Sequence, residues 1–220
     1  MIIPTIFVLK GENFEERFRK VTSISNLVQI DFMDGFFVNS ESVDIEEIPD
    51  LNEFPLIEFE AHLMVDNPES IIEKVFLKGF KRVIFHFEAT SSLNSSKAVI
   101  ETIRRYGLDY IIAINPETST EELVYLSSSI KKVLLLGVHP GVENQSFIEE
   151  TYDRVKNLKQ KGFFVQVDGG VNEEVAEKLG EIGCDAINSG SYISNSVNPE
   201  NALLELKLAF EKGRRRYLDE

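Results

Sequence analysis

Apolar and polar positions along the chain form two alternating patterns, short apolar runs and longer amphipathic stretches. The apolar runs predict β-strands at residues 2–8, 27–33, 57–65, 82–88, 110–115, 132–138, 163–168 and 186–189. The amphipathic stretches predict helices, among them residues 68–78, 93–106, 120–127, 147–161, 172–182 and 199–212. Strands that alternate with helices predict a parallel sheet, and eight of them favour a closed (β/α)8 TIM barrel over an open doubly wound sheet.

The chain shows no sign of a domain boundary. No linker, low-complexity tract or change of composition interrupts its 220 residues. Residues 36–55 are acidic and irregular, which predicts a long loop after the second strand. We therefore expect a single barrel domain over residues 1–220.

Composition narrows the partners and the compartment. The net charge of −14 argues against nucleic acid and anionic membranes as partners. No run approaches the roughly 18 apolar residues of a membrane span, and the first residues lack the basic segment of a signal peptide. The single cysteine, Cys184, excludes an internal disulfide, and no Cys/His ligand spacing is present. These features predict a cytoplasmic protein.

Two aspartates lie at the ends of apolar runs. Asp31 belongs to VQIDFMDG (residues 28–35), and Asp168 belongs to FFVQVDGG (residues 163–170). A carboxylate at the end of a buried strand is costly unless it is paired, bound to metal or used in chemistry. Since active sites of parallel barrels lie at the carboxyl ends of the strands, we expect both aspartates in one site.

Strand alternation brings two histidines to the same end of the barrel. Side chains on one face of a strand recur with period two. The sets that share a face are Gln29, Asp31 and Met33; Glu60, His62 and Met64; Ile84, His86 and Glu88; and Phe164, Gln166 and Asp168. One such histidine is most often a hydrogen-bonded core residue. Two histidines with two aspartates on four strand ends favour a polar site and leave metal binding open.

Glycine-bearing loops follow the last two predicted strands. They read DGGVN (residues 168–172) and NSGSYIS (residues 188–194). Barrel enzymes commonly hold phosphate on backbone N–H groups at these two places, and glycine lets the backbone approach the anion closely. The pair predicts a phosphate ester ligand. The third histidine, His139, lies in a turn-forming loop, GVHPGVENQSF, where no special role is expected.

The ordered set of motifs resembles the ribulose-phosphate 3-epimerase family. It comprises PTIFVLKGENF, QIDFMDGFFVN, FEAHLMVDNPE, VIFHFEAT, AINPET, VHPGVENQSF, VQVDGGVN and GSYI, from Pro4 to about Ser194. The resemblance implies a TIM barrel of the ribulose-phosphate-binding type and a cytoplasmic isomerase of the pentose phosphate pathway, assembled as a homo-oligomer. It implies conversion of D-ribulose 5-phosphate to D-xylulose 5-phosphate by inversion of carbon 3. Two aspartates would move the proton, and a divalent metal would stabilise the enediolate.

The resemblance also implies roles for individual residues. Asp31 and Asp168 match the acid/base pair and metal ligands, and His62 matches a third ligand. The residues that match substrate and phosphate contacts are Thr5, Met33, Met64, Gly141, Gly169, Gly170, Gly190 and Ser191. These roles agree with the chemistry, because abstraction of a proton next to a carbonyl needs a positioned base and a group that holds the enediolate charge.

Two places depart from the family pattern. Gln29 stands where the family has a fourth ligand, a histidine, so we expect weaker binding of the metal, which would be zinc, iron or manganese. The loop after the sixth strand has Gly141-Val142-Glu143-Asn144-Gln145 in place of a glycine-rich run. We expect this lid to be stiffer, and Glu143 to place a negative charge where a phosphate approaches.

Three alternative functions are weighed against the epimerase. The altered lid leaves open a related epimerase acting on a ketohexose 6-phosphate. Gln29 leaves open a paralogue that binds a phosphorylated sugar without turnover. A decarboxylase of the related barrel group would need a lysine between two aspartates on one strand end, and the sequence DFMD (residues 31–34) has none.

Overall fold

Eight parallel strands form a closed barrel in the computed structural model, which describes residues 1–90, 92–124 and 130–219. Each strand pairs with the next along the chain, and β8 pairs with β1. The strands are β1 (Ile2–Ile6), β2 (Leu27–Met33), β3 (Glu58–Met64), β4 (Arg82–His86), β5 (Asp109–Ile114), β6 (Lys132–Leu136), β7 (Phe164–Asp168) and β8 (Ala186–Ser189). The predicted TIM barrel is thereby confirmed.

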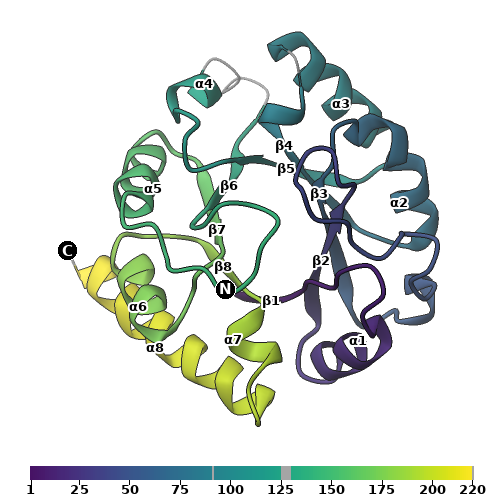
Figure 1. Cartoon of the computed structure of the whole chain (residues 1–220). Helices are drawn as coiled ribbons and strands as arrows, with labels where there is room; N and C mark the ends of the chain where they lie inside the picture. Colours follow the sequence, from purple (N-terminus) through teal and green to yellow (C-terminus); the bar gives the residue numbers. More distant parts are fainter. Residues whose placement is uncertain (91, 125–129, 220) are drawn as a thin grey trace.

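Helices surround the barrel on its outer side (Figure 1). They are α1 (Phe14–Thr22), α2 (Ile72–Lys78), α3 (Leu93–Arg105), α4 (Glu121–Val124), α5 (Thr151–Gln160), α6 (Glu173–Glu181), α7 (Ser191–Ser194) and α8 (Pro199–Asp219). Short 3-10 turns are η1 (Leu51–Glu53), η2 (Pro68–Ile71) and η3 (Phe87–Ala89). No helix in the described ranges is long and apolar enough to cross a membrane.

Two of the predicted helix boundaries need correction. The helix predicted over residues 147–161 begins only at Thr151, and the last helix continues to Asp219. Of the helix predicted over residues 120–127, only Glu121–Val124 is described as α4, and residues 125–127 lie outside the described part of the chain. Helix α1 was not among the predicted helices.

Helix α1 is fixed at its start and along one face. The side chain of Asn13 accepts a hydrogen bond from the backbone N–H of Glu16, which caps the helix. Phe14, Phe18 and Val21 are buried, and the ring of Phe18 stacks on that of Phe59 from β3 with 5.9 Å between centroids. Burial of this stripe anchors the helix against the barrel and orients its other faces.

Strand β4 ends two residues earlier than the pattern predicts. The chain turns into η3 after His86, and Thr90 donates both its backbone N–H and its hydroxyl to the carbonyl of Phe87. Glu88 therefore lies on a turn and not on the strand face. Its carboxylate accepts hydrogen bonds from the backbone N–H of Asn115 at 2.8 Å and from the hydroxyl of Thr118, which hold the turn against the end of β5.

The interior of the barrel is divided into an apolar side and a polar side. The apolar side comes from β4, β5 and β6, and its residues are Ile84, Ile111, Ala113, Leu134 and Leu136. The polar side comes from β2, β3, β7 and β8, and its fully buried residues are Gln29, Glu60, Gln166 and Asn188. Buried polar groups require hydrogen-bonded partners, so this layer constrains which side chains can stand above it.

Helices α6 and α8 approach each other at two glycines. A Cβ on Gly180 would lie 2.3 Å from the carbonyl oxygen of Phe210, and one on Gly213 would lie 2.0 Å from that of Glu177. Only glycine permits this contact of backbones. It seats α8, with its buried Leu203, across the outside of the barrel beside α6 (Figure 1).

Candidate active site

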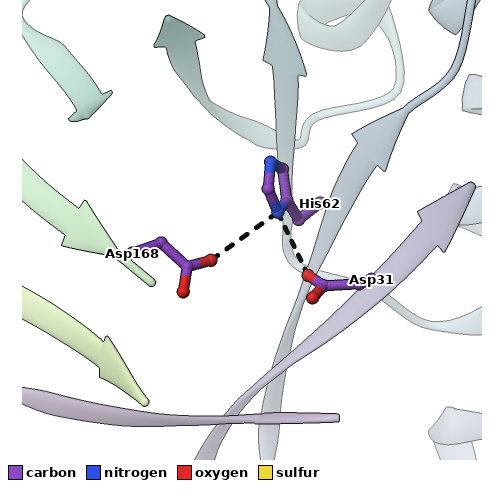
Figure 2. Close-up of side chains that lie close together, drawn as sticks. All are labelled: Asp31, His62 and Asp168. Carbon is purple, nitrogen blue, oxygen red and sulfur yellow. Dashed lines mark hydrogen bonds and ion pairs between the residues drawn. The ribbon is translucent and has the colours of Figure 1, made fainter. Parts of the chain in front are cut away.

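Three polar side chains meet at the carboxyl ends of the strands. Asp31 on β2, His62 on β3 and Asp168 on β7 point toward one another (Figure 2). His62 Nδ1 lies 3.1 Å from Asp31 Oδ1 and 3.7 Å from Asp168 Oδ2. All three residues are buried, and one ligand atom from each lies within 4.8 Å of the others.

Strand register explains why these residues meet. Asp31 and His62 are direct partners in the pairing of β2 with β3, and Asp168 is the last residue of β7. All three face the barrel interior at the level where the strands end. Alternation along the strands and pairing between them are therefore sufficient to assemble the group.

A cavity of about 430 Å³ opens above the group. Of the residues predicted to form the site, those on its wall are Thr5, Asp31, His62, Met64, Gly141, Asp168, Gly169, Gly170, Gly190 and Ser191. Met33 is not on this wall and packs in a small apolar cluster with Phe7, Val38 and Met64. Gln29 is fully buried next to the two aspartates. The cavity is large enough for a small phosphorylated sugar.

Gln29 presents its N–H groups to the two aspartates. Its Nε2 donates to Asp168 Oδ2 at 2.6 Å and to Asp31 Oδ1 at 2.9 Å, and its Oε1 accepts from Asn188 Nδ2 at 2.8 Å. The amide oxygen, which is the atom that could bind a metal, therefore faces away from His62. In this orientation Gln29 holds the two carboxylates together and adds no fourth ligand.

A chain of hydrogen bonds across the barrel fixes this orientation. Gln166 Nε2 donates to Asn188 Oδ1 at 2.7 Å and to Glu60 Oε1 at 2.8 Å, and Glu60 Oε2 accepts from Arg82 Nη1 at 2.8 Å. An ionised carboxylate can only accept, so Glu60 requires the amide nitrogen of Gln166 to face it. Because Gln166 donates to the oxygen of Asn188, the nitrogen of Asn188 faces the oxygen of Gln29. The nitrogen of Gln29 is thereby left facing the aspartates.

His62 is oriented from its other side by His86. The Nε2 atoms of the two rings lie 3.0 Å apart, and His86 Nδ1 lies 3.4 Å from Glu88 Oε2. With the His86 proton on Nδ1, toward Glu88, its Nε2 accepts from His62 Nε2–H. When His62 is neutral, this arrangement leaves the lone pair of its Nδ1 directed at the two aspartates, as a metal ligand requires; without a metal, a proton on Nδ1 is donated to Asp31.

Burial shifts the pKa values of the group. It raises the pKa of Asp168 to about 7, with the negative charge of Asp31 adding to the shift and His62 and Gln29 opposing it. Burial lowers the pKa of His62, but the hydrogen bond to Asp31 and the charges of both aspartates outweigh it, and the net pKa is raised. Without a cation the group therefore retains protons that exposed groups would release.

The donor set fits a divalent ion. Two carboxylate oxygens and one imidazole nitrogen converge, and the ligand histidine has the outer hydrogen-bond partner that metal-bound histidines use. Asp31, His62 and Asp168 would hold the ion.

Glycines on two loops form the other end of the cavity. Gly169 has φ +96°, and a Cβ there would lie 2.3 Å from Val138 Cγ2. No other residue type fits this backbone position, which bends the chain directly after Asp168. Gly190 and Ser191 follow β8 at the start of α7, so backbone from both loops lines the cavity.

The segment between β6 and α5, residues 137–150, lies across the centre of the barrel opening (Figure 1). Ser40 Oγ donates to the carbonyl of Gly141 at 2.6 Å, and Gln145 Nε2 donates to the carbonyls of His139 and Val142 at 2.6 and 2.8 Å. These bonds connect residues 137–150, called the lid from here on, to the loop after β2 and also link residues within the lid. The side chain of His139 is mostly exposed, and its Nδ1 lies 2.8 Å from Glu117 Oε1.

Arg17 contacts the lid, and the sequence pattern did not predict its part in this region. Its Nη1 donates to Glu143 Oε1 at 3.0 Å and to the carbonyl of Phe7 at 2.8 Å. The two charged residues are 126 positions apart, and Arg17 lies on a helix and not at a strand end. A signal was present in Glu143, the one acidic residue of Gly141–Gln145, because a buried carboxylate needs a cation nearby, but the sequence does not say which one.

Comparison with known sequences gives a consistent match. A profile described as the ribulose-phosphate 3 epimerase family matches residues 1–194. A protein of Chlamydia muridarum (strain MoPn / Nigg) named ribulose-phosphate 3-epimerase is 32% identical over 193 residues, 83% of each chain. One of the same name from Bacillus subtilis (strain 168) is 27% identical over 193 residues, 83% of this chain and 86% of that one.

Solved structures share the fold. KGPDC from Streptococcus mutans, solved as a complex, gives a TM-score of 0.73 at 13% identity and covers 96% of this chain and 97% of that chain. Orotidine 5'-phosphate decarboxylase from Pyrococcus horikoshii OT3 gives a TM-score of 0.65 at 18% identity and covers 97% and 99%. At these identities the likeness concerns the barrel alone.

Proposed function

Because the chain belongs to the ribulose-phosphate 3-epimerase family, a family of isomerases, we propose that it converts D-ribulose 5-phosphate to D-xylulose 5-phosphate by inversion of carbon 3. One observation carries the proposal. Asp31 and Asp168 enter the cavity from strands on different sides of the opening, with His62 between them (Figure 2). Inversion requires a proton to leave one face of a carbon and return to the other, and two opposed carboxyl groups can do this.

The two carboxyl groups would exchange roles during each turnover. In the metal-free protein, burial and the charge of Asp31 raise the pKa of Asp168 to about 7, which suits a carboxyl group that both holds and releases a proton. Asp31 would then take the proton from carbon 3, and Asp168 would deliver its proton to the opposite face. The N–H groups of Gln29 would keep both carboxylates in position.

We assign a divalent cofactor, zinc, iron or manganese, to Asp31, His62 and Asp168. When bound, such an ion stabilises the negative charge that develops on the two oxygens of the enediolate. Gln29 supplies hydrogen bonds where the family has a fourth ligand, so the ion would be held less tightly than by four ligands.

Other parts of the cavity would bind the substrate. Gly141, Gly169, Gly170, Gly190 and Ser191 would surround its phosphate. Nearer the reacting carbons, Thr5 and Met64 would contact the sugar, with Met33 supporting Met64 from the apolar cluster that both occupy. Family resemblance further supports a cytoplasmic homo-oligomer built from one barrel domain per chain.

Deuterium entry at carbon 3 of D-ribulose 5-phosphate, followed by NMR in D2O, tests the proposal. The protein is first treated with chelator and then supplied with zinc, iron or manganese. Exchange that returns with a metal supports the epimerase and identifies the ion. Absence of exchange under every condition contradicts it.

The same experiment separates two other candidate functions. Gln29 as a hydrogen-bond donor, in place of a ligand, favours a phosphosugar-binding protein without turnover, which would bind the substrate and exchange no proton. The altered lid leaves open an epimerase acting on a ketohexose 6-phosphate, which would exchange deuterium into that substrate instead.

A further inference from the structure

No lysine or arginine lies among the described residues that line the cavity. The carboxylates on this wall are those of Asp31 and Asp168, which would hold the metal, and that of Glu143 at the other end. A sugar phosphate brings up to two negative charges into this environment. Backbone N–H groups can contact the phosphate, but they carry no full charge to offset that of Glu143 and the phosphate.

Arg17 lies behind the cavity wall and contacts one wall residue, Glu143. Its guanidinium donates to Glu143 Oε1 at 3.0 Å, and both side chains are mostly buried, with exposed fractions of 23% and 18%. The second bond of Nη1, to the carbonyl of Phe7, fixes the guanidinium at the end of β1. A buried arginine in a fixed position is suited to binding phosphate.

The carboxylate of Glu143 lies against the loop that would receive the phosphate. Its Oε1 is 3.5 Å from the position that a Cβ on Gly190 would take. Asn144, next in the chain, has φ +60°, a left-handed backbone conformation within the lid. A negatively charged oxygen thus lies between Arg17 and Gly190.

From this arrangement we propose that Arg17 binds the phosphate of the substrate and that Glu143 occupies its place until the substrate arrives. The phosphate replaces the Glu143 carboxylate on the guanidinium, and the released lid residue turns toward solvent. Arg17 is thus a specificity-determining residue for phosphorylated ligands. The placement of the phosphate rests on the proposed function.

Affinity for inorganic phosphate, measured by isothermal titration calorimetry, tests this exchange without any need for catalysis. Glu143→Gln should tighten binding roughly fivefold, because the competing anion is removed. Arg17→Gln should weaken it by about tenfold or more, because a charge-assisted pair is lost. In the double variant the gain from Glu143→Gln should disappear, since it depends on Arg17.

Matched controls separate this exchange from a general effect of charge. Glu15 and Arg19 form an exposed pair on the same helix, 2.8 Å apart, so Glu15→Gln and Arg19→Gln change the same charges away from the cavity. Neither should alter phosphate affinity more than about twofold. Additive effects in the double variant, or equal effects of the control substitutions, would overturn the proposal. If Arg17→Gln does not fold, Arg17→Lys should bind phosphate more weakly than the unaltered protein while keeping the charge.

A substrate measurement distinguishes failure of this inference from failure of the proposed function. Arg17→Gln should raise KM for D-ribulose 5-phosphate and leave kcat within about threefold. If no proton exchange occurs but the phosphate affinities follow the expected order, Arg17 remains a phosphate-binding residue in a protein of another function. If exchange occurs and Arg17→Gln leaves both KM and phosphate affinity unchanged, the inference is wrong and the epimerase remains.

Discussion

At one end of the cavity the polar groups are carried by strands, and at the other end they are carried by loops and by one helix. Asp31, His62 and Asp168 each lie on a strand, and buried partners fix them from below and from the side. Arg17 and Glu143 meet only because the lid reaches from the centre of the opening to α1. The strand-borne groups are therefore held by the barrel itself, whereas the contact between Arg17 and Glu143 can break without any change in the barrel.

This difference suits the two tasks of the proposed reaction. Proton transfer requires reacting groups held within a fraction of an ångström, which strands provide. Admission and release of a charged ligand require contacts that break and form again, which loops provide. Substitutions at the strand end should therefore affect the chemical step, and those at the loop end should affect binding.

The largest effect is expected at Asp168. Asp168→Asn should lower the rate of deuterium exchange at carbon 3 by about 10³-fold or more, because the proton donor is lost. Asp153→Asn, on the exposed face of α5, should leave that rate unchanged. A near-normal rate for Asp168→Asn would show that the two-carboxylate mechanism is wrong.

Although Asp168→Asn should lower the exchange rate, it should make the folded protein more stable at neutral pH. Since burial raises the pKa of Asp168 from 3.8 to about 7, the folded protein holds a proton that the unfolded chain releases near pH 4. In chelator, the free energy of unfolding should therefore fall as the pH rises from about 4 to about 7, by on the order of 2 to 4 kcal/mol. Asp168→Asn should remove this loss, as measured by thermal or urea unfolding across the pH range.

A smaller effect is expected at Gln29. Gln29→His places an imidazole where an amide N–H now faces the aspartates, and it should raise zinc affinity by roughly tenfold or more and increase the exchange rate. Competition with a chromophoric chelator measures the affinity. Gln160→His, at the exposed end of α5, controls for an added surface histidine. No gain over this control would mean that the ligands are not the three residues assigned here.

The smallest effect is expected at the loop end. Gly190→Ala adds a methyl group whose nearest neighbour, Glu143 Oε1, is 3.5 Å away, so the fold should tolerate it. The methyl group would narrow the place proposed for the phosphate, and KM should rise about three- to tenfold with little change in kcat. Thermal unfolding checks the fold. An unchanged KM would place the phosphate elsewhere.

The strand end was also the part that the sequence predicted best. Periodicity placed Asp31, His62 and Asp168 on strand ends, and the closed barrel brings them together. Asp34, which alternates to the other face, takes no part in the group and instead accepts hydrogen bonds from the backbone N–H groups of Phe36, Phe37 and Asp66. Local spacing and a regular fold were sufficient for these results.

Contacts between distant segments explain what the sequence did not predict. The orientation of Gln29 depends on Asn188 and, through Gln166, on Glu60, which is 106 positions from Gln166. Glu88 was assigned to a strand because its spacing fits one, but hydrogen bonds from the end of β5 draw it into a turn. Spacing along one strand carries no information about such partners.

The pairing of β1 with β8 has a consequence for how the protein is made. Ile2 is the register partner of Ile187, so β1 can pair with β8 only after the rest of the barrel has been synthesised. Until β8 is synthesised, β1 has one open edge, and such edges are prone to pair with other chains. Closure also requires a contact across most of the chain, which slows folding. Expression at low temperature or with chaperones should therefore improve the yield of folded protein more than changes at the active site do.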